Sequence, residues 1–159
     1  MTKQSITKSL RFPALLILLI WVIHIIKVGL DLPWNAWGIL PRSVTGIRGI
    51  LTAPLLHGDF GHLIGNSLPL IVLTTMLFLF YKKVALKSFM MIYILTGLAV
   101  WLFARHVYHI GASGVVYGLI SFVFWSGIFR RNLRSIVLAL IVTILYSGYF
   151  MGIAPNQRG

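Results

Sequence analysis

The twenty-residue run His62-LIGNSLPLIVLTTMLFLF-Tyr81 decides the fold of this chain, because it is apolar almost throughout and long enough to cross a bilayer. Lipid offers the backbone no hydrogen-bond partner, so a continuous apolar run of this length predicts a membrane-spanning helix. Polar side chains are costly at membrane depth, yet the run keeps His62 and Asn66 four residues apart, on one face of that helix. The run therefore predicts a membrane helix that carries a polar site.

The rest of the chain repeats this apolar pattern. Further apolar runs lie at about residues 12–30, 84–104, 112–129 and 135–153, and each approaches the length that a spanning helix needs. The chain of 159 residues is 58% hydrophobic and 10% charged, whereas soluble domains are about a quarter charged. The first run is too long for a signal peptide and is predicted to be a retained span. The sequence thus predicts one all-α, polytopic membrane domain over residues 1–159.

The basic residues predict the orientation of this domain. A formal net charge of +12 is typical of nucleic-acid-binding proteins, but here the charges form short clusters between apolar runs, so no nucleic-acid partner is expected. Nine of the 14 Lys and Arg residues lie in the N-terminal tail and in the connections at 82–87 and 130–134. The positive-inside rule then places the N-terminus in the cytoplasm and, after five spans, the C-terminus outside. Anionic lipid is the other partner that suits these basic connections.

A second polar motif opens the run at 112–129. In Gly111-Ala-Ser113-Gly114 the glycines permit close backbone approach, so Ser113 can be presented at the N-terminus of a helix. Unpaired N–H groups and the positive end of the helix dipole favour a developing oxyanion there. Tyr117 follows one turn later, and Gly118 continues a G-x-x-x-G face with Gly114. Small-residue faces usually serve helix packing, so this motif alone does not establish catalysis.

His62 and Asn66 give the serine motif more weight. Both side chains can donate hydrogen bonds toward one point, and together with the Ser113 backbone N–H they could form an oxyanion hole. The alternative for the pair is an interhelical hydrogen bond worth about 0.6–2 kcal/mol. His57 precedes the helix and is expected to organise the loop rather than to react. His24, alone in the first run, is expected to be a hydrogen-bonded interior residue.

Other classes of site fit the sequence less well. The chain has no cysteine, which excludes disulfides, thiolate ligands and cysteine nucleophiles. His57, His62, His106 and His109 could ligate a metal, but no carboxylate-rich set accompanies them, so neither a metal nor another cofactor is expected. The two acidic residues of the chain lie outside the apolar runs, which speaks against an ion pathway and hence against a transporter or channel.

The two motifs stand in a specific order on successive spans: His57-x4-His62-x3-Asn66, then Gly111-x-Ser113-Gly114 with a tyrosine four residues beyond the serine. This arrangement resembles the rhomboid family of intramembrane serine proteases. The likeness covers about residues 49–118 in detail and the rest of the chain by the order of its spans. It implies a six-helix core, a serine–histidine dyad that needs no aspartate or cofactor, and cleavage of transmembrane protein substrates near the membrane surface.

The resemblance also implies roles for individual residues. Ser113 would be the nucleophile, while His62, Asn66 and the Ser113 amide would form the oxyanion hole. Tyr117 would pack against the catalytic histidine. His57 would be a supporting residue, together with the glycines of the serine motif.

The chain departs from the family pattern in its first connection and at its general base. The family often carries an adjacent Trp-Arg pair in the first connection, whereas Trp37 and Arg42 are separated here. In the family the base is a histidine on a sixth span, but the last histidine here is His109. His109 lies in a loop, and using His62 as the base would leave the oxyanion hole short of a donor. The chain is therefore expected to be an incomplete copy, with five of six helices and its base beyond Gly159.

Two further expectations follow from the absent sixth span. The face formed by Gly114 and Gly118 is expected to lack its partner helix, because small residues are useful only where something packs on them. The chain by itself is expected to be inactive. The leading interpretation is an intramembrane serine endopeptidase of a bacterial inner membrane. The alternative is a catalytically inactive, rhomboid-like scaffold that binds transmembrane helices.

Overall fold

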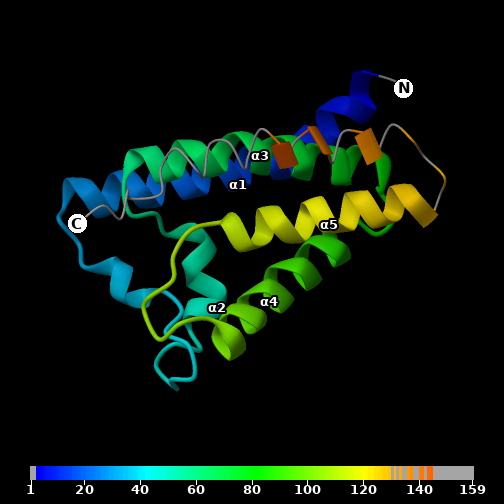
Figure 1. Ribbon diagram of the computed structural model, residues 1–159. Coiled ribbons are helices and arrows are strands. Elements are labelled where there is room, and N and C mark those ends of the chain that lie inside the picture. The colour runs from blue at the N-terminus through cyan, green and yellow to red at the C-terminus, as the bar shows by residue number, and fades with distance from the viewer. Residues whose placement is uncertain are drawn as a thin grey trace.

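The computed structural model is a bundle of helices (Figure 1). It describes residues 3–129 together with residues 131, 133, 136, 137, 140, 141, 143 and 144. The longer helices are α1 (Lys3–Gly29), α3 (Phe60–Phe80), α4 (Ala85–Phe103) and α5 (Ser113–Phe129). The first connection holds the short helix α2 (Gly49–Thr52) and the 3-10 turns η1 (Trp34–Trp37) and η2 (Ala53–Leu55). The prediction of an all-α membrane bundle is confirmed for this part of the chain.

The helices can be compared with the apolar runs of the sequence. Helices α3, α4 and α5 begin and end within two residues of the runs at 62–81, 84–104 and 112–129. Among the described residues, α1, α3 and α4 are long and apolar enough to cross a membrane, and α5 is a shorter apolar helix. Helix α1 begins nine residues before its apolar run, because helical hydrogen bonding continues into the polar tail. The run predicted at 135–153 lies largely outside the described residues.

Helices α1 and α3 lie antiparallel and side by side (Figure 1). At one end of the pair, Ser9 Oγ donates a hydrogen bond to the Phe78 carbonyl at 3.1 Å. Nearer the other end, Trp21 Nε1 donates to Ser67 Oγ at 3.0 Å. Helix α5 packs on both α3 and α4, so the start of α5 lies close to the start of α3. The two polar motifs of the sequence are thereby carried to the same end of the bundle.

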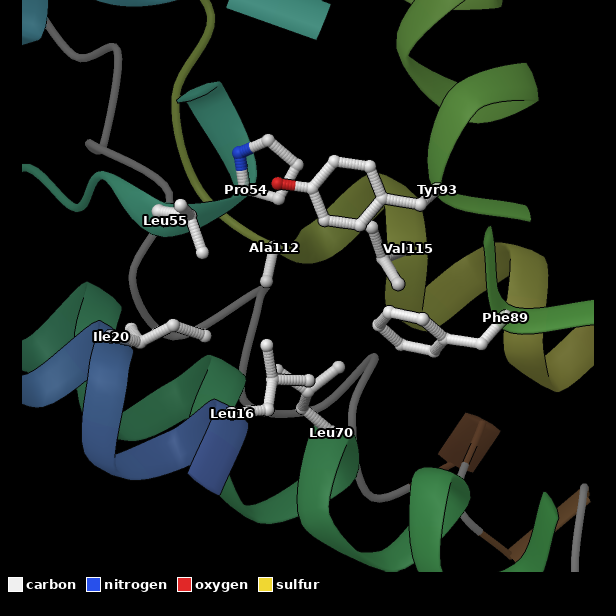
Figure 2. Close-up of a pocket in the computed structure, with 9 residues that line it drawn as sticks. All are labelled: Leu16, Ile20, Pro54, Leu55, Leu70, Phe89, Tyr93, Ala112 and Val115. Atoms are coloured by element: carbon white, nitrogen blue, oxygen red, sulfur yellow. The ribbon is translucent and has the colours of Figure 1, made fainter. Parts of the chain in front are cut away.

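An apolar junction fixes the residues around this end. Figure 2 shows nine side chains from α1, η2, α3, α4, α5 and the residue before α5 that converge on one small void: Leu16, Ile20, Pro54, Leu55, Leu70, Phe89, Tyr93, Ala112 and Val115. Ala112 and Val115 are 1% and 2% exposed, and they flank Ser113 in the chain. Burying such side chains stabilises the fold by about 1.5–3 kcal/mol for each large one. The junction therefore holds the first turn of α5 in place.

The first connection is a folded unit attached to α4. Arg42 Nη1 donates to the carbonyls of Leu102 (3.2 Å) and Ala104 (2.8 Å), which satisfies orphan carbonyls at the end of α4. Trp101 Nε1 donates in return to the Ser43 carbonyl at 2.9 Å. The separated Trp37 and Arg42 of the sequence do not pair with each other. Instead, the guanidinium of Arg48 lies over the Trp37 ring, 5.4 Å from its centroid.

The expectation that Gly114 and Gly118 lack a partner helix is wrong. Helix α4 packs directly on this face, where a Cβ on Gly118 would lie 2.5 Å from Ile92 Cγ2 and 2.9 Å from Thr96 Cγ2. A Cβ on Gly114 would meet Thr96 at 3.6 Å, an ordinary contact. The sequence could not identify this partner, because a face of glycines can pack against any of several helices.

Replacing Gly118 with alanine should therefore push α4 and α5 apart. Overpacking of this kind costs about 1–3 kcal/mol, which outweighs the gain of about 1 kcal/mol in helix propensity. Gly114→Ala is the matched control, since its Cβ fits and should leave stability unchanged or slightly raised. Thermal unfolding in detergent measures both variants. Equal midpoints for the two would contradict this account of the α4–α5 contact.

Candidate active site

The first turn of α3 is fixed by Asp59, its N-cap. The Asp59 carboxylate accepts a hydrogen bond of 2.8 Å from the backbone N–H of His62, which satisfies a donor at the helix start. Asn66 lies one turn further on and is 4% exposed. Its Nδ2 donates to the His62 carbonyl at 2.9 Å, so one of its two amide hydrogens is used within the helix.

Gly111 brings the serine motif against His62. Its φ of +104° is a conformation that side-chain-bearing residues rarely adopt. A Cβ at this position would lie 2.6 Å from His62 Cε1 and closer still to Nε2, so only a glycine lets the backbone approach the ring. The Gly111 N–H donates to the Ala53 carbonyl at 2.8 Å, which ties this approach to η2. The two motifs that the sequence singled out therefore meet at the His62 imidazole.

Ser113 is the first residue of α5, as its bracketing glycines suggested. It is half-buried and lines a cavity of about 100 Å³. The other walls come from residues 39, 53 and 54 of the first connection, from residues 96, 97 and 100 of α4, and from residues 109–111, 114 and 115 around Ser113 itself. His62 and Asn66 do not line this cavity. Ser113 thus borders a hollow that Gly111, the residue in contact with the His62 ring, also lines.

His57 and His24 occupy the interior near the start of α3. His57 is fully buried, and its ring lies edge-on to that of His62 with the centroids 5.1 Å apart. His24 is 1% exposed and lies edge-on to Phe60 at 4.7 Å. In the described part of the chain, neither ring has a hydrogen-bond partner for its nitrogens. The interior position expected for His24 is confirmed, and its ring packs against an aromatic ring.

The remaining histidines are held by backbone carbonyls. His106 Nδ1 lies 2.8 Å from the Pro41 carbonyl, and His109 Nε2 lies 2.9 Å from the Arg105 carbonyl. His109 also lines the cavity beside Ser113, and its backbone forms an antiparallel bridge with Ile39. Within residues 3–129 no histidine is hydrogen-bonded to the Ser113 hydroxyl. Over the same residues, no three histidine or acidic side chains converge as a set of metal ligands.

The other residues of the serine motif lie on either side of α5. Gly114 and Gly118 face α4, as described above. Tyr117, one turn beyond Ser113, is 47% exposed. The helix therefore packs through its glycines on one side and presents Tyr117 on another.

Burial lowers the pKa of His57 from its ordinary value of 6.5 to about 3, with smaller contributions from the neighbouring charges of His62, His24 and Lys27. The unfolded chain takes up a proton here below about pH 6.5, whereas the folded chain does not until about pH 3. The unfolded state thus binds more protons between these values, and the free energy of unfolding falls as the pH drops through them. At pH 5 the expected loss is about 2 kcal/mol, at about 1.36 kcal/mol per pKa unit.

Thermal unfolding in detergent between pH 7 and pH 4.5 measures this loss. The wild-type midpoint should fall with pH, and His57→Leu, which fills the same space without titrating, should show a shallower fall. The same slope in both proteins would show that His57 does not titrate as its burial requires.

Lys27 has contacts in this region that the sequence did not predict. It lies in the last part of the first apolar run, and its side chain is 7% exposed while its ammonium contacts the residues before α3. A lysine inside an otherwise apolar run was the available signal, because a charge at that depth needs partners.

The fold and the meeting of the two motifs define an integral membrane protein with a candidate serine site at one end of its helix bundle. The model of the rhomboid domain matches residues 44–158, and the chain belongs to the rhomboid family. This confirms the resemblance that the histidine–asparagine and serine motifs indicated.

The chain is also similar to mycobacterial proteins. It is 36% identical over 124 residues to an uncharacterized protein of Mycobacterium tuberculosis and to one of Mycobacterium bovis, with 74% of this chain and 52% of each relative covered. An uncharacterized protein of Mycobacterium leprae is 31% identical over 152 residues, or 92% of this chain and 59% of the relative. The chain thus spans about half the length of the curated relatives it matches. No solved structure gives a significant match.

Proposed function

We propose that the protein is an intramembrane serine endopeptidase that cleaves transmembrane protein substrates near the membrane surface. The observation that carries the proposal is the contact between Gly111 and the His62 ring. It brings the loop that presents Ser113 against the helix that presents His62 and Asn66. The proposal is also supported by membership of the rhomboid family, whose proteases the two motifs resemble.

The proposed reaction uses Ser113 as the nucleophile. Its hydroxyl oxygen attacks the scissile carbonyl, its proton passes to a general base, and an acyl-enzyme forms as the amine leaves with that proton. Water then attacks the ester and restores the hydroxyl. His62, Asn66 and the Ser113 backbone N–H would donate to the oxyanion of each tetrahedral intermediate. No metal or cofactor enters this scheme.

We propose that the general base is a histidine outside these 159 residues. Each of the five histidines here has another environment: His24 and His57 are buried in the interior, His62 lies against Gly111, and the other two are held by carbonyls. The relatives are about twice as long as the matched part of this chain, which leaves room for such a residue. The cavity beside Ser113 suits a small side chain of the substrate.

The proposed location is a bacterial inner membrane with the N-terminus in the cytoplasm. Through the contact between Ser9 and Phe78, the basic tail of α1 lies at the same end as the connection with Lys82 and Lys83 and the start of α4 with Lys87. The positive-inside rule makes that end cytoplasmic. Ser113 and His62 lie at the other end, so cleavage would take place toward the outer surface.

The full-length protein in lipid vesicles, mixed with a single-span substrate, tests the proposal against the scaffold alternative. A protease releases two substrate fragments at a fixed peptide bond. A scaffold retains the substrate through detergent extraction and leaves it intact. Binding without any fragment, at enzyme-to-substrate ratios near one, would overturn the proposal.

A further inference from the structure

Lys27 carries a buried charge in the last turns of α1. Its side chain is 7% exposed, and its ammonium donates to three oxygens: Asn35 Oδ1 at 2.9 Å, the Gly58 carbonyl at 3.3 Å and the His57 carbonyl. Three donors are thus matched by three acceptors. All three acceptors are neutral, and the nearby Asp59 carboxylate is the opposite charge that attracts the ammonium. An apolar side chain of the same size is often at least as stable at such a buried position. Stability alone therefore does not account for this lysine.

The two carbonyls that accept hydrogen bonds from Lys27 belong to His57 and Gly58, which lie beside the His62 ring. A Cβ on Gly58 would lie 3.9 Å from His62 Nδ1, so the backbone of residue 58 faces that side of the imidazole. The His57 ring lies edge-on to it, as described above. Gly111 lies beside the ring at Nε2 and Cε1. The imidazole thus lies against both the backbone at residue 58 and the backbone at Gly111.

The two backbone segments beside the imidazole are fixed by separate hydrogen bonds. At Gly111 the backbone N–H donates to the Ala53 carbonyl. At residues 57–58 both carbonyls accept hydrogen bonds from Lys27 of α1. We infer that Lys27 is a positioning residue: it fixes the backbone before α3 and thereby sets the His62 imidazole at the site where Ser113 reacts. This inference rests on the proposed protease function and deepens it.

The test uses the full-length protein and the vesicle cleavage assay. Lys27→Met keeps the length of the side chain but removes its donors, and a small displacement of His62 should lower kcat about 10²-fold while KM changes less than about twofold. Lys27→Arg should recover part of the loss, because the guanidinium can donate to the same carbonyls. Lys8→Met, an exposed change on the same helix, is the matched control and should behave as wild type.

Asn35→Ala keeps the inference testable even if Lys27→Met does not fold. Asn35 is exposed, so its replacement leaves the core intact but removes one acceptor of the Lys27 ammonium. We therefore expect kcat to fall measurably while the thermal stability stays unchanged. An unchanged kcat in Asn35→Ala or in a folded Lys27→Met, with an active wild type, overturns the positioning role alone. A rise in KM without a change in kcat also overturns it. An inactive wild type instead contradicts the proposed function.

Discussion

Replacing Ser113 with alanine is expected to abolish cleavage of a transmembrane substrate by the full-length protein. The substitution removes the hydroxyl oxygen that we propose forms the acyl-enzyme, while the buried neighbours Ala112 and Val115 keep the start of α5 in place. Removal of a serine nucleophile typically lowers kcat about 10⁶-fold, with substrate binding retained. The vesicle assay would register this as the complete absence of fragments from a substrate that still copurifies with the protein.

The matched control is Ser121→Ala. Ser121 lies on the same helix and is exposed, so its loss should leave cleavage unchanged. Fragments at the wild-type rate from the Ser113→Ala protein would show that another residue is the nucleophile. The proposed mechanism would then be wrong, whatever the family relationship.

Replacing Gly111 with alanine should have the second-largest effect. A φ of +104° is strained for any residue with a Cβ, at a cost of about 1–3 kcal/mol. The new Cβ would also overlap the His62 ring, so that the loop, the ring or both must move. Because this contact brings the loop before Ser113 against the start of α3, where the proposed oxyanion donors lie, kcat should fall about 10²–10³-fold. Initial rates in vesicles, together with thermal unfolding, separate the catalytic loss from the loss of stability.

Gly29→Ala is the control for Gly111→Ala. Gly29 ends α1, and a Cβ there would meet nothing within 4 Å, so its substitution should alter neither rate nor stability by a measurable amount. If Gly111→Ala retains wild-type activity, then the loop does not need to approach His62 and the shared site is not the catalytic one.

The helices of this protein could be predicted from the sequence because lipid imposes a simple rule. An apolar run of sufficient length must satisfy its backbone internally, and α3, α4 and α5 accordingly end within two residues of their runs. The donor groups of His62 and Asn66 suggested a site shared with the serine motif, and the family pattern strengthened that prediction. No local rule brings residue 62 to residue 111, because that contact depends on how α3 and α5 pack.

The features that could not be predicted depend on contacts between distant segments. The first connection carries no periodic pattern, yet Arg42 and Trp101 bind it to the end of α4 through backbone carbonyls. The partner of Gly118 could not be identified because several helices could fit a glycine face. The contacts of Lys27 could not be predicted, because nothing in its neighbouring residues shows that its side chain reaches the carbonyls before α3.

The central claim is that the Ser113 hydroxyl is an activated nucleophile in the site it shares with His62. Treatment of the full-length protein with a fluorophosphonate, followed by mass-spectrometric mapping of the adduct, tests this claim most directly. The account predicts one covalent adduct, on Ser113, formed in wild type and strongly slowed in Gly111→Ala. An adduct confined to a different serine, or none at all under conditions where substrate is cleaved, would contradict it.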